Sequence, residues 1–153
     1  MKTLAIKILP VAMIALSSCG NDSENVQAPE IVQKAFNLKF KHAESVKWEK
    51  ENDSEWEAEF TINKDEFSAN FDLQGNWKET ERSINEGELP SFVVDEIDEN
   101  FSDYEIEEAE VVETANGISY ECLVEMREHK YEVKIAENGA FSKQEIEDSD
   151  DED

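Results

Sequence analysis

The side chains in this sequence that could take part in catalysis or metal binding are those of two histidines, two cysteines and 39 acidic residues. The spacing of His42 and His129 matches no metal-binding motif, and we interpret both as solvated. Acidic residues are so numerous that any fold would bring some of them together, so they do not indicate carboxylate-pair catalysis. The sequence has no Gly-rich phosphate loop and no nucleophile elbow. We therefore predict a protein that is not an enzyme, with no cofactor and no dedicated metal site; weak binding of divalent cations by the carboxylates is compatible with this.

Cys19 is the cysteine for which the sequence indicates a modification. Lys2 and Lys7 precede an apolar run over residues 8–16. This run is too short to span a bilayer, and with the lysines before it the segment has the form of an export signal. The run ends in Leu-Ser-Ser-Cys, which resembles the lipobox of bacterial lipoproteins. The resemblance implies cleavage before Cys19 and diacylation of its sulfur; the alternative is a plain secretory signal with an incidental cysteine.

Several predictions of location depend on this signal. Residues 1–18 are expected to be a lipoprotein signal peptide and residues 19–28 a flexible polar tether. The mature chain is expected to be held by a lipid anchor at the outer membrane of a Gram-negative bacterium, facing the periplasm or the surface. Without a partner for Cys122, no disulfide forms within the mature chain. Cys122 falls on the apolar phase of a strand, and we interpret it as a core residue.

The charge of the chain restricts its partners. The formal net charge is −25, from 39 acidic and 14 basic residues. Phosphate binding needs clustered Lys and Arg, so nucleic acid is excluded as a partner, and an anionic membrane surface is disfavoured. Contact with a membrane is expected only through the lipid anchor. A basic protein or peptide partner is compatible with this charge, and so is the alternative that acidity serves solubility.

Two stretches show the period of an amphipathic helix. Pro29 and Pro90 are each placed to be the first residue of a helix. Apolar residues then recur at intervals of four, which predicts a single apolar stripe on about three turns. The two stripes are Val32, Phe36 and Phe40 in the first stretch and Val93, Ile97 and Phe101 in the second.

After each helix the apolar period becomes two, which is typical of strands with one covered face. Residues 56–77 and 120–141 match in residue type at an offset of 64, aromatic with aromatic and glycine with glycine. The helices are offset by 61, so three extra residues are expected between Phe101 and Tyr120, at the turn over residues 114–117. Each copy also has a first short strand, with Val46 and Trp48 or Ala109 and Val111 in its apolar phase.

These patterns predict an α+β fold of two tandem α-β-β-β-β repeats. Each repeat is expected to form an antiparallel sheet covered by a helix on one face, and the two sheets to join into one curved sheet. The predicted repeats span residues 29–82 and 90–148, with a linker over 83–89 and a disordered acidic tail over 149–153.

The uncovered sheet face is the candidate binding surface. Alternation places acidic and polar residues there in both repeats, and the apolar Leu123 among them favours contact with a protein or peptide partner. The alternative is that this is only the solvated face of an amphipathic sheet. The predicted binding residues are Glu57, Glu59, Asn70, Asp72, Glu121, Leu123 and Glu125.

The export signal, the two repeats and their aromatic and glycine spacing together resemble the PepSY-like family of exported bacterial proteins, also described as beta-lactamase-inhibitor-like. The resemblance covers residues 29–148. It implies a continuous curved sheet and a non-enzymatic role, in binding or in inhibiting another protein. An inhibitor of an exported hydrolase is therefore the second hypothesis, with Asn63-Lys64-Asp65 or the turn at Thr114, Asn116 and Gly117 as the inserting loop.

Overall fold

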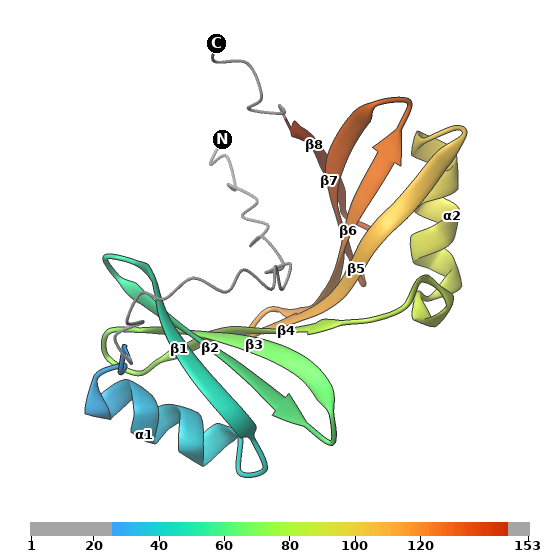
Figure 1. Cartoon of the computed structure of the whole chain (residues 1–153). Helices are drawn as coiled ribbons and strands as arrows, with labels where there is room; N and C mark the ends of the chain where they lie inside the picture. Colours follow the sequence, from blue (N-terminus) through green and yellow to red (C-terminus); the bar gives the residue numbers. More distant parts are fainter. Residues whose placement is uncertain (1–25, 147–153) are drawn as a thin grey trace, which may run out of the picture. The chain divides into compact units, whose positions relative to one another are not determined.

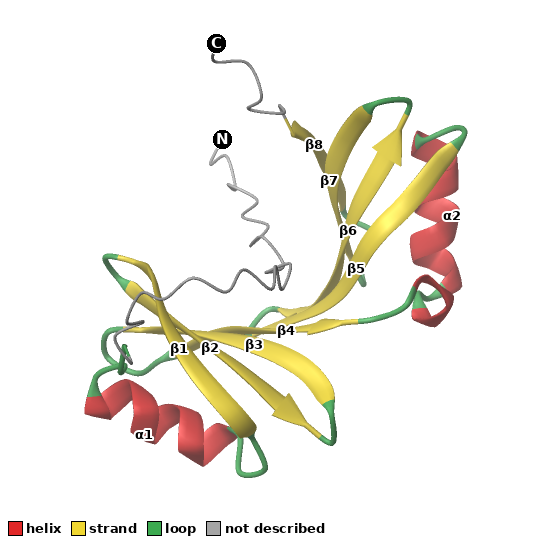
Figure 2. Cartoon of the chain, in the orientation of Figure 1, coloured by secondary structure: helices red, strands yellow, loops and turns green. Residues whose placement is uncertain are grey.

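A computed structural model of the chain describes residues 26–146 (Figure 1). The predicted signal peptide, Cys19, most of the predicted tether and the acidic tail lie outside the described residues. The described chain divides into two compact units, one ending at Thr80 and the other beginning at Glu81, which we call the first and the second unit. The order of elements is a helix followed by four strands, and this order occurs twice (Figure 2).

The first half of the chain contains one helix and four strands. Helix α1 covers one face of the strands that follow it, as Figure 1 shows. The last strand crosses the boundary between the units, because the boundary falls after Thr80. The bounds are α1 Glu30–Lys39, β1 Glu44–Asn52, β2 Glu55–Ile62, β3 Asp65–Asp72 and β4 Trp77–Ser83.

The second half repeats this order after a short 3-10 helix, η1. Helix α2 packs its apolar stripe against β5, β6 and β7. The bounds are η1 Glu86–Glu88, α2 Ser91–Asn100, β5 Tyr104–Thr114, β6 Gly117–Met126, β7 His129–Ala136 and β8 Phe141–Ile146. The residues predicted to be a linker, 83–89, therefore contain the end of β4 and η1.

The eight strands are hydrogen-bonded to one another in their order along the chain, in one antiparallel sheet. The predicted α+β class and the joining of the strands into a single sheet are confirmed; the curvature of that sheet stays a prediction. The β2–β3 and β6–β7 hairpins have the same register at an offset of 64: Ala58 pairs with Ala69, and Cys122 pairs with Val133.

Each helix begins one residue later than predicted. Pro29 has a ψ of 146° and Pro90 a ψ of 147°, which is extended rather than helical backbone. Their carbonyl groups accept the first helical hydrogen bonds, from Val32 N–H at 2.9 Å and from Val93 N–H at 2.9 Å. The prolines are therefore N-cap residues, and the missing proline N–H lies outside the helical ladder.

The predicted apolar stripes form the two cores. In the first unit, Val32 and Phe36 are buried against Ala58, Phe60 and Phe71. The Phe36 and Phe60 ring centroids lie 5.0 Å apart in an edge-to-face arrangement, which is a favourable geometry for aromatic pairs.

The core of the second unit replaces these rings mostly with aliphatic side chains. Val93 and Ile97 of α2 pack with Val124, Val133 and Ile135, all fully buried. Burying each such side chain contributes about 1.5–3 kcal/mol.

The first strand departs from the prediction. Val46 is 38% exposed rather than in the core. The register of β1 shifts between Glu44 and Lys47, and Ser45 has a φ of 56°. This bulge moves Val46 out of the apolar phase, while Trp48 keeps its place opposite Ala58.

The three extra residues of the second half lie in the β5–β6 hairpin. Glu49 pairs with Glu57 across the β1–β2 hairpin, whereas Glu110 pairs with Glu121 across the longer β5–β6 hairpin, which closes at Thr114–Gly117. The hairpin is longer because its strands extend further before they turn, which is where the insertion was expected.

Candidate functional site

The sheet face opposite the helices carries the predicted binding residues, but its centre is not open. Glu57 is 6% exposed, Asn70 is 4% exposed and Glu121 is 6% exposed. The face was expected to be uncovered, and at these three positions it is not. Neighbouring strands lie about 5 Å apart, so the long side chains of flanking positions cover the middle of the face. Glu59 and Leu123 are half-buried.

Glu57 lies at the centre of this face in the first unit. It pairs with Glu49 on β1 and with Asn70 on β3. Burial, together with the like charges of Glu51, Glu59 and Glu49, raises the pKa of Glu57 to about 7, against the opposing effect of a hydrogen bond from Ser68. Glu57 is thus a carboxyl group that titrates near neutral pH and has several negatively charged neighbours.

Asn70 completes this centre. Its amide Nδ2 donates a hydrogen bond to Glu79 Oε1 at 3.4 Å. Its carbonyl Oδ1 is buried and has no hydrogen-bond partner among the described residues. Leaving such an acceptor unsatisfied costs about 1–3 kcal/mol. The first unit therefore holds a buried acceptor beside a buried carboxyl group.

The second unit has a lysine at the corresponding place. Glu121 pairs with Lys134 across β6 and β7, and Lys134 Nζ donates a hydrogen bond to Glu121 Oε1. The two side chains are 7% and 27% exposed. Beside them, burial and then the charges of Glu121 and Glu108 raise the pKa of Glu110, while a hydrogen bond from Ser83 Oγ at 3.2 Å opposes that rise.

Leu123 lies between two acidic neighbours, opposite Glu108 on β5 and Glu132 on β7. Burial, followed by the charge of Glu121, raises the pKa of Glu132. The apolar Leu123 adds to the burial of Glu132, which disfavours the charged form of that carboxyl group.

Glu125 belongs to a cluster with Glu107 and Lys130 that is more exposed than the centre of the face. We call the accessible side chains around that centre, among them Glu59 and Glu125, the rim. Lys130 Nζ lies 2.6 Å from Glu107 Oε2, and this hydrogen bond holds the pKa of Glu107 below its usual value. The hydrogen bond between Glu125 and Glu107 raises the pKa of Glu125. The β5 bulge between Ile106 and Glu108 lies beside this cluster.

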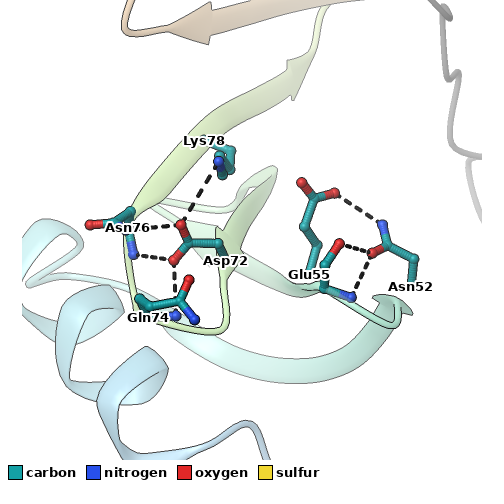
Figure 3. A network of polar contacts seen from close by, with 7 residues as sticks. Asn52, Glu55, Asp72, Gln74, Asn76 and Lys78 are labelled. Carbon is teal, nitrogen blue, oxygen red and sulfur yellow. Dashed lines mark hydrogen bonds and ion pairs between the residues drawn. The ribbon is translucent and has the colours of Figure 1, made fainter.

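Asp72 has a structural role that the sequence pattern did not indicate. Its carboxylate accepts hydrogen bonds from Gln74 N–H at 3.0 Å, Asn76 N–H at 2.8 Å and Asn76 Nδ2 at 2.9 Å (Figure 3). Lys78 Nζ lies 3.8 Å away. The hydrogen bonds from Asn76 lower the pKa of Asp72 most. Asp72 therefore stabilises the β3–β4 turn, and its acceptor sites are largely used within the turn.

Sequence reasoning missed several acidic residues that share these surroundings. It considered the polar positions of the central strands and left out the outer ones. Alternation around Trp48 and Ala109 would have placed Glu49 and Glu110 on the same face. The missed residues are Glu49, Glu51, Glu79, Glu107, Glu108 and Glu110.

The other candidate chemical groups lie apart from this face. Cys122 is 1% exposed and free, as predicted for a core residue, and burial raises the pKa of its thiol to about 12. His42 is exposed, and His129 Nδ1 lies 2.7 Å from Glu145 Oε1 at an exposed position. Within residues 26–146, no group of three or more His, Cys, Asp or Glu side chains is arranged to hold a metal ion. None of the described helices is long and apolar enough to cross a membrane.

An antiparallel sheet in chain order, with a helix against each set of strands, defines an α+β protein with one polar sheet face. A family model described as "Putative beta-lactamase-inhibitor-like, PepSY-like" matches residues 54–143. The chain therefore belongs to the PepSY-like family, as its repeats and aromatic spacing indicated.

Solved structures share this fold. A BLIP-like protein from Bacteroides fragilis is 20% identical, with a TM-score of 0.72 over 86% of this chain and 96% of that chain. A DUF2874 family protein from Bacteroides uniformis is 21% identical, with a TM-score of 0.71 over 78% and 90%. A structure from Bacteroides eggerthii, named "putative periplasmic proteins", is 20% identical, with a TM-score of 0.72 over 79% and 91%. The comparison with curated proteins finds no match.

Proposed function

We propose that the protein is a non-enzymatic binding module of the cell envelope that presents its acidic sheet face to a protein or peptide partner. The observation that carries this proposal is the concentration of acidic side chains on one sheet face in both units, where the pKa values of Glu57, Glu110 and Glu125 are raised and Glu121 is paired with Lys134. A basic partner would relieve this repulsion and would be steered to the face by its charge. The family description and the BLIP-like relative support a binding role.

The test is affinity capture from cell-envelope extract at low and at moderate salt. The Glu59→Lys, Glu125→Lys double variant changes the rim of the face in both units, where side chains are accessible. We expect it to reduce partner capture at least tenfold, and added salt to weaken capture by the wild type. Asp95→Lys, on the exposed side of α2, makes a charge change of the same kind away from the face and should leave capture unchanged. Equal capture by the double variant and the wild type would refute the proposal.

The location is a further part of the proposal. Cys19 carries the lipid anchor, residues 1–18 are the signal peptide, residues 19–28 hold the module away from the membrane, and the chain resides at the outer membrane of a Gram-negative bacterium. The lipobox-like sequence supports this, and so does the name of the Bacteroides eggerthii relative, which is called periplasmic. Cys19→Ala should move the chain from the membrane fraction to the soluble fraction. Membrane association that survives this change would contradict the anchor.

The two halves are copies of one α-β-β-β-β unit in this proposal, with repeats over residues 29–82 and 90–148, a linker over 83–89 and an unstructured tail over 149–153. The equal registers of β2–β3 and β6–β7 support a duplication. It predicts that the central strands of the two units present equivalent positions 64 residues apart, with different contacts where the residue types differ, as at Asn70 and Lys134. Paired charge changes can test this.

Inhibition of an exported hydrolase is the second candidate function. The family description favours it, and the β2–β3 turn is suited to insertion because Asn63 and Lys64 both have positive φ, 54° and 79°, in a tight exposed turn. A rigid turn loses little entropy when it enters an active site. Replacing Asn63-Lys64 with Gly-Gly should abolish inhibition of a beta-lactamase or peptidase, and replacing Ala115-Asn116 tests the other candidate loop. Inhibition that is indifferent to both replacements would exclude this mode.

A further inference from the structure

We propose that Glu57 and Asn70 form a binding site for a primary ammonium group, and that a lysine side chain of the partner peptide occupies it. This inference rests on the proposed function and specifies the chemistry of the partner. It follows from a difference between the two units at corresponding positions.

The second unit shows what satisfies such a carboxylate. Glu121 on β6 receives a hydrogen bond from Lys134 on the neighbouring strand β7. Glu57 and Asn70 occupy the same register positions, 64 residues earlier, on β2 and β3. Asparagine stands where the second unit has lysine, so the first unit lacks the ammonium group that neutralises its counterpart.

Asn70 presents an acceptor to an incoming donor. Its Nδ2 is engaged by Glu79 Oε1, and this contact sets the orientation of the amide, because reversing it would bring two oxygens together. Oδ1 has no hydrogen-bond partner among the described residues, and Asn70 is only 4% exposed. The carboxyl group of Glu57 lies on the directly opposite residue. An ammonium group has three donors and can serve both acceptors together.

The surrounding charge selects a cation. Glu49, Glu51 and Glu59 all raise the pKa of Glu57 through their negative charge, so the site has a strongly negative potential. The nearby Lys47 does not neutralise it, since its side chain is 80% exposed and its Nζ lies 4.0 Å from Glu59. Such an exposed pair is weak.

The depth of the site favours lysine over arginine. Glu57 is only 6% exposed, so a ligand must place its charge below the rim side chains. Lysine carries a compact ammonium on a slim four-carbon stem, whereas the guanidinium of arginine is a broad planar fork. The side chain of Glu59 at the rim is 46% exposed and can turn aside as the stem enters.

The site can be tested by titrating the full-length chain with a capped peptide that has a single central lysine. The matched probes are the same peptide with Nε-acetyl-lysine or with arginine in place of the lysine. Acetylation should weaken binding at least about tenfold, because it removes a charge-assisted hydrogen bond. Asn70→Lys supplies the missing ammonium from within the chain and should abolish peptide binding. Glu57→Gln should weaken binding about tenfold. Asn100→Lys, at the exposed end of α2, adds the same charge elsewhere and should bind as the wild type does.

Two results would overturn the inference: equal binding of the lysine and acetyl-lysine peptides, or undiminished binding by both Asn70→Lys and Glu57→Gln. Free lysine that binds as tightly as the peptide would overturn the assignment to a partner peptide. If the rim double variant loses an envelope partner that Asn70→Lys retains, the proposed function stands and the ammonium site fails. If no envelope partner is captured but Asn70→Lys loses the lysine peptide, the site stands and the proposed function fails.

Discussion

Glu57 on β2 lies directly opposite Asn70 on β3, whereas the corresponding Glu121 on β6 is hydrogen-bonded to Lys134 on β7. The two units thus bury a carboxyl group at the same point of the sheet and treat it differently. In the second unit an ammonium group neutralises it, and in the first unit its pKa rises to about 7. This difference makes the two positions respond differently to substitution.

Loss of Lys134 should destabilise the second unit. Lys134→Met removes the partner of the Glu121 carboxyl group, which is 6% exposed, and we expect this to cost about 2 kcal/mol because a buried polar group without its partner is unfavourable. Urea unfolding at pH 7 measures this. Lys130→Met is the matched control: its pair with Glu107 is more exposed, at 37% and 30%, and should cost less than about 1 kcal/mol. Equal costs for the two variants would show that the Glu121 pair gains nothing from its burial.

The pKa of Glu57 predicts that stability falls as pH rises. Its folded pKa is about 7, above the ordinary value of 4.5, so between these values the folded state binds the proton more tightly than the unfolded state. The group therefore lowers stability as pH rises from about 4.5 to about 7, by on the order of 2 kcal/mol after allowance for solvent screening.

Chemical denaturation from pH 4.5 to 8 measures this dependence. Glu57→Gln removes the titrating group, so stability should fall less across this range and the variant should be more stable than the wild type at pH 8. Glu59→Gln removes only one neighbouring charge and should keep most of the slope. A slope that Glu57→Gln leaves unchanged would assign the dependence to other carboxyl groups, of which Glu110 and Glu132 also have raised pKa values.

Gly75 should be far less tolerant of substitution than Gly139, although the two are 64 residues apart in matching turns. Both have positive φ, 80° and 79°, which alone costs an alanine about 1 kcal/mol. A Cβ at Gly75 would also lie 2.9 Å from the backbone oxygen of Ile31 on α1, whereas nothing lies within 4 Å at Gly139. Thermal unfolding should therefore show a clearly larger loss for Gly75→Ala than for Gly139→Ala. Losses of similar size would mean that α1 adjusts to the added methyl group.

The regular features of the fold follow from the sequence because they depend on local periodicity. Intervals of four identified both helical stripes, and alternation identified the buried phase of β2, β3, β6 and β7. The departure at Val46 could not be predicted, since the bulge at Ser45 depends on how β1 pairs with β2.

The candidate site was predicted less well, for a different reason. Alternation assigns a residue to a face, but burial on that face depends on the neighbours across the sheet. Glu57 and Glu121 therefore looked as exposed in the sequence as Glu59 does. The role of Asp72 was also hidden, because its acceptors are used by Gln74 and Asn76 in a turn whose geometry the sequence pattern does not specify.

The Cys122 thiol should be inert in the folded protein. It is 1% exposed, and burial, followed by the charges of Glu121 and Glu110, raises its pKa to about 12, so almost no thiolate forms at pH 8. Iodoacetamide should therefore modify it very slowly in buffer and readily in urea, and the rate at intermediate urea should follow the unfolded fraction, as mass spectrometry would show. Ser119→Cys, on β6 beside the same acidic residues, is a control for burial, since Ser119 is 6% exposed. Asn116→Cys, in the exposed turn, is the control for access and should react at once. Rapid native labelling of Cys122 would show that the second unit opens locally around β6 without global unfolding.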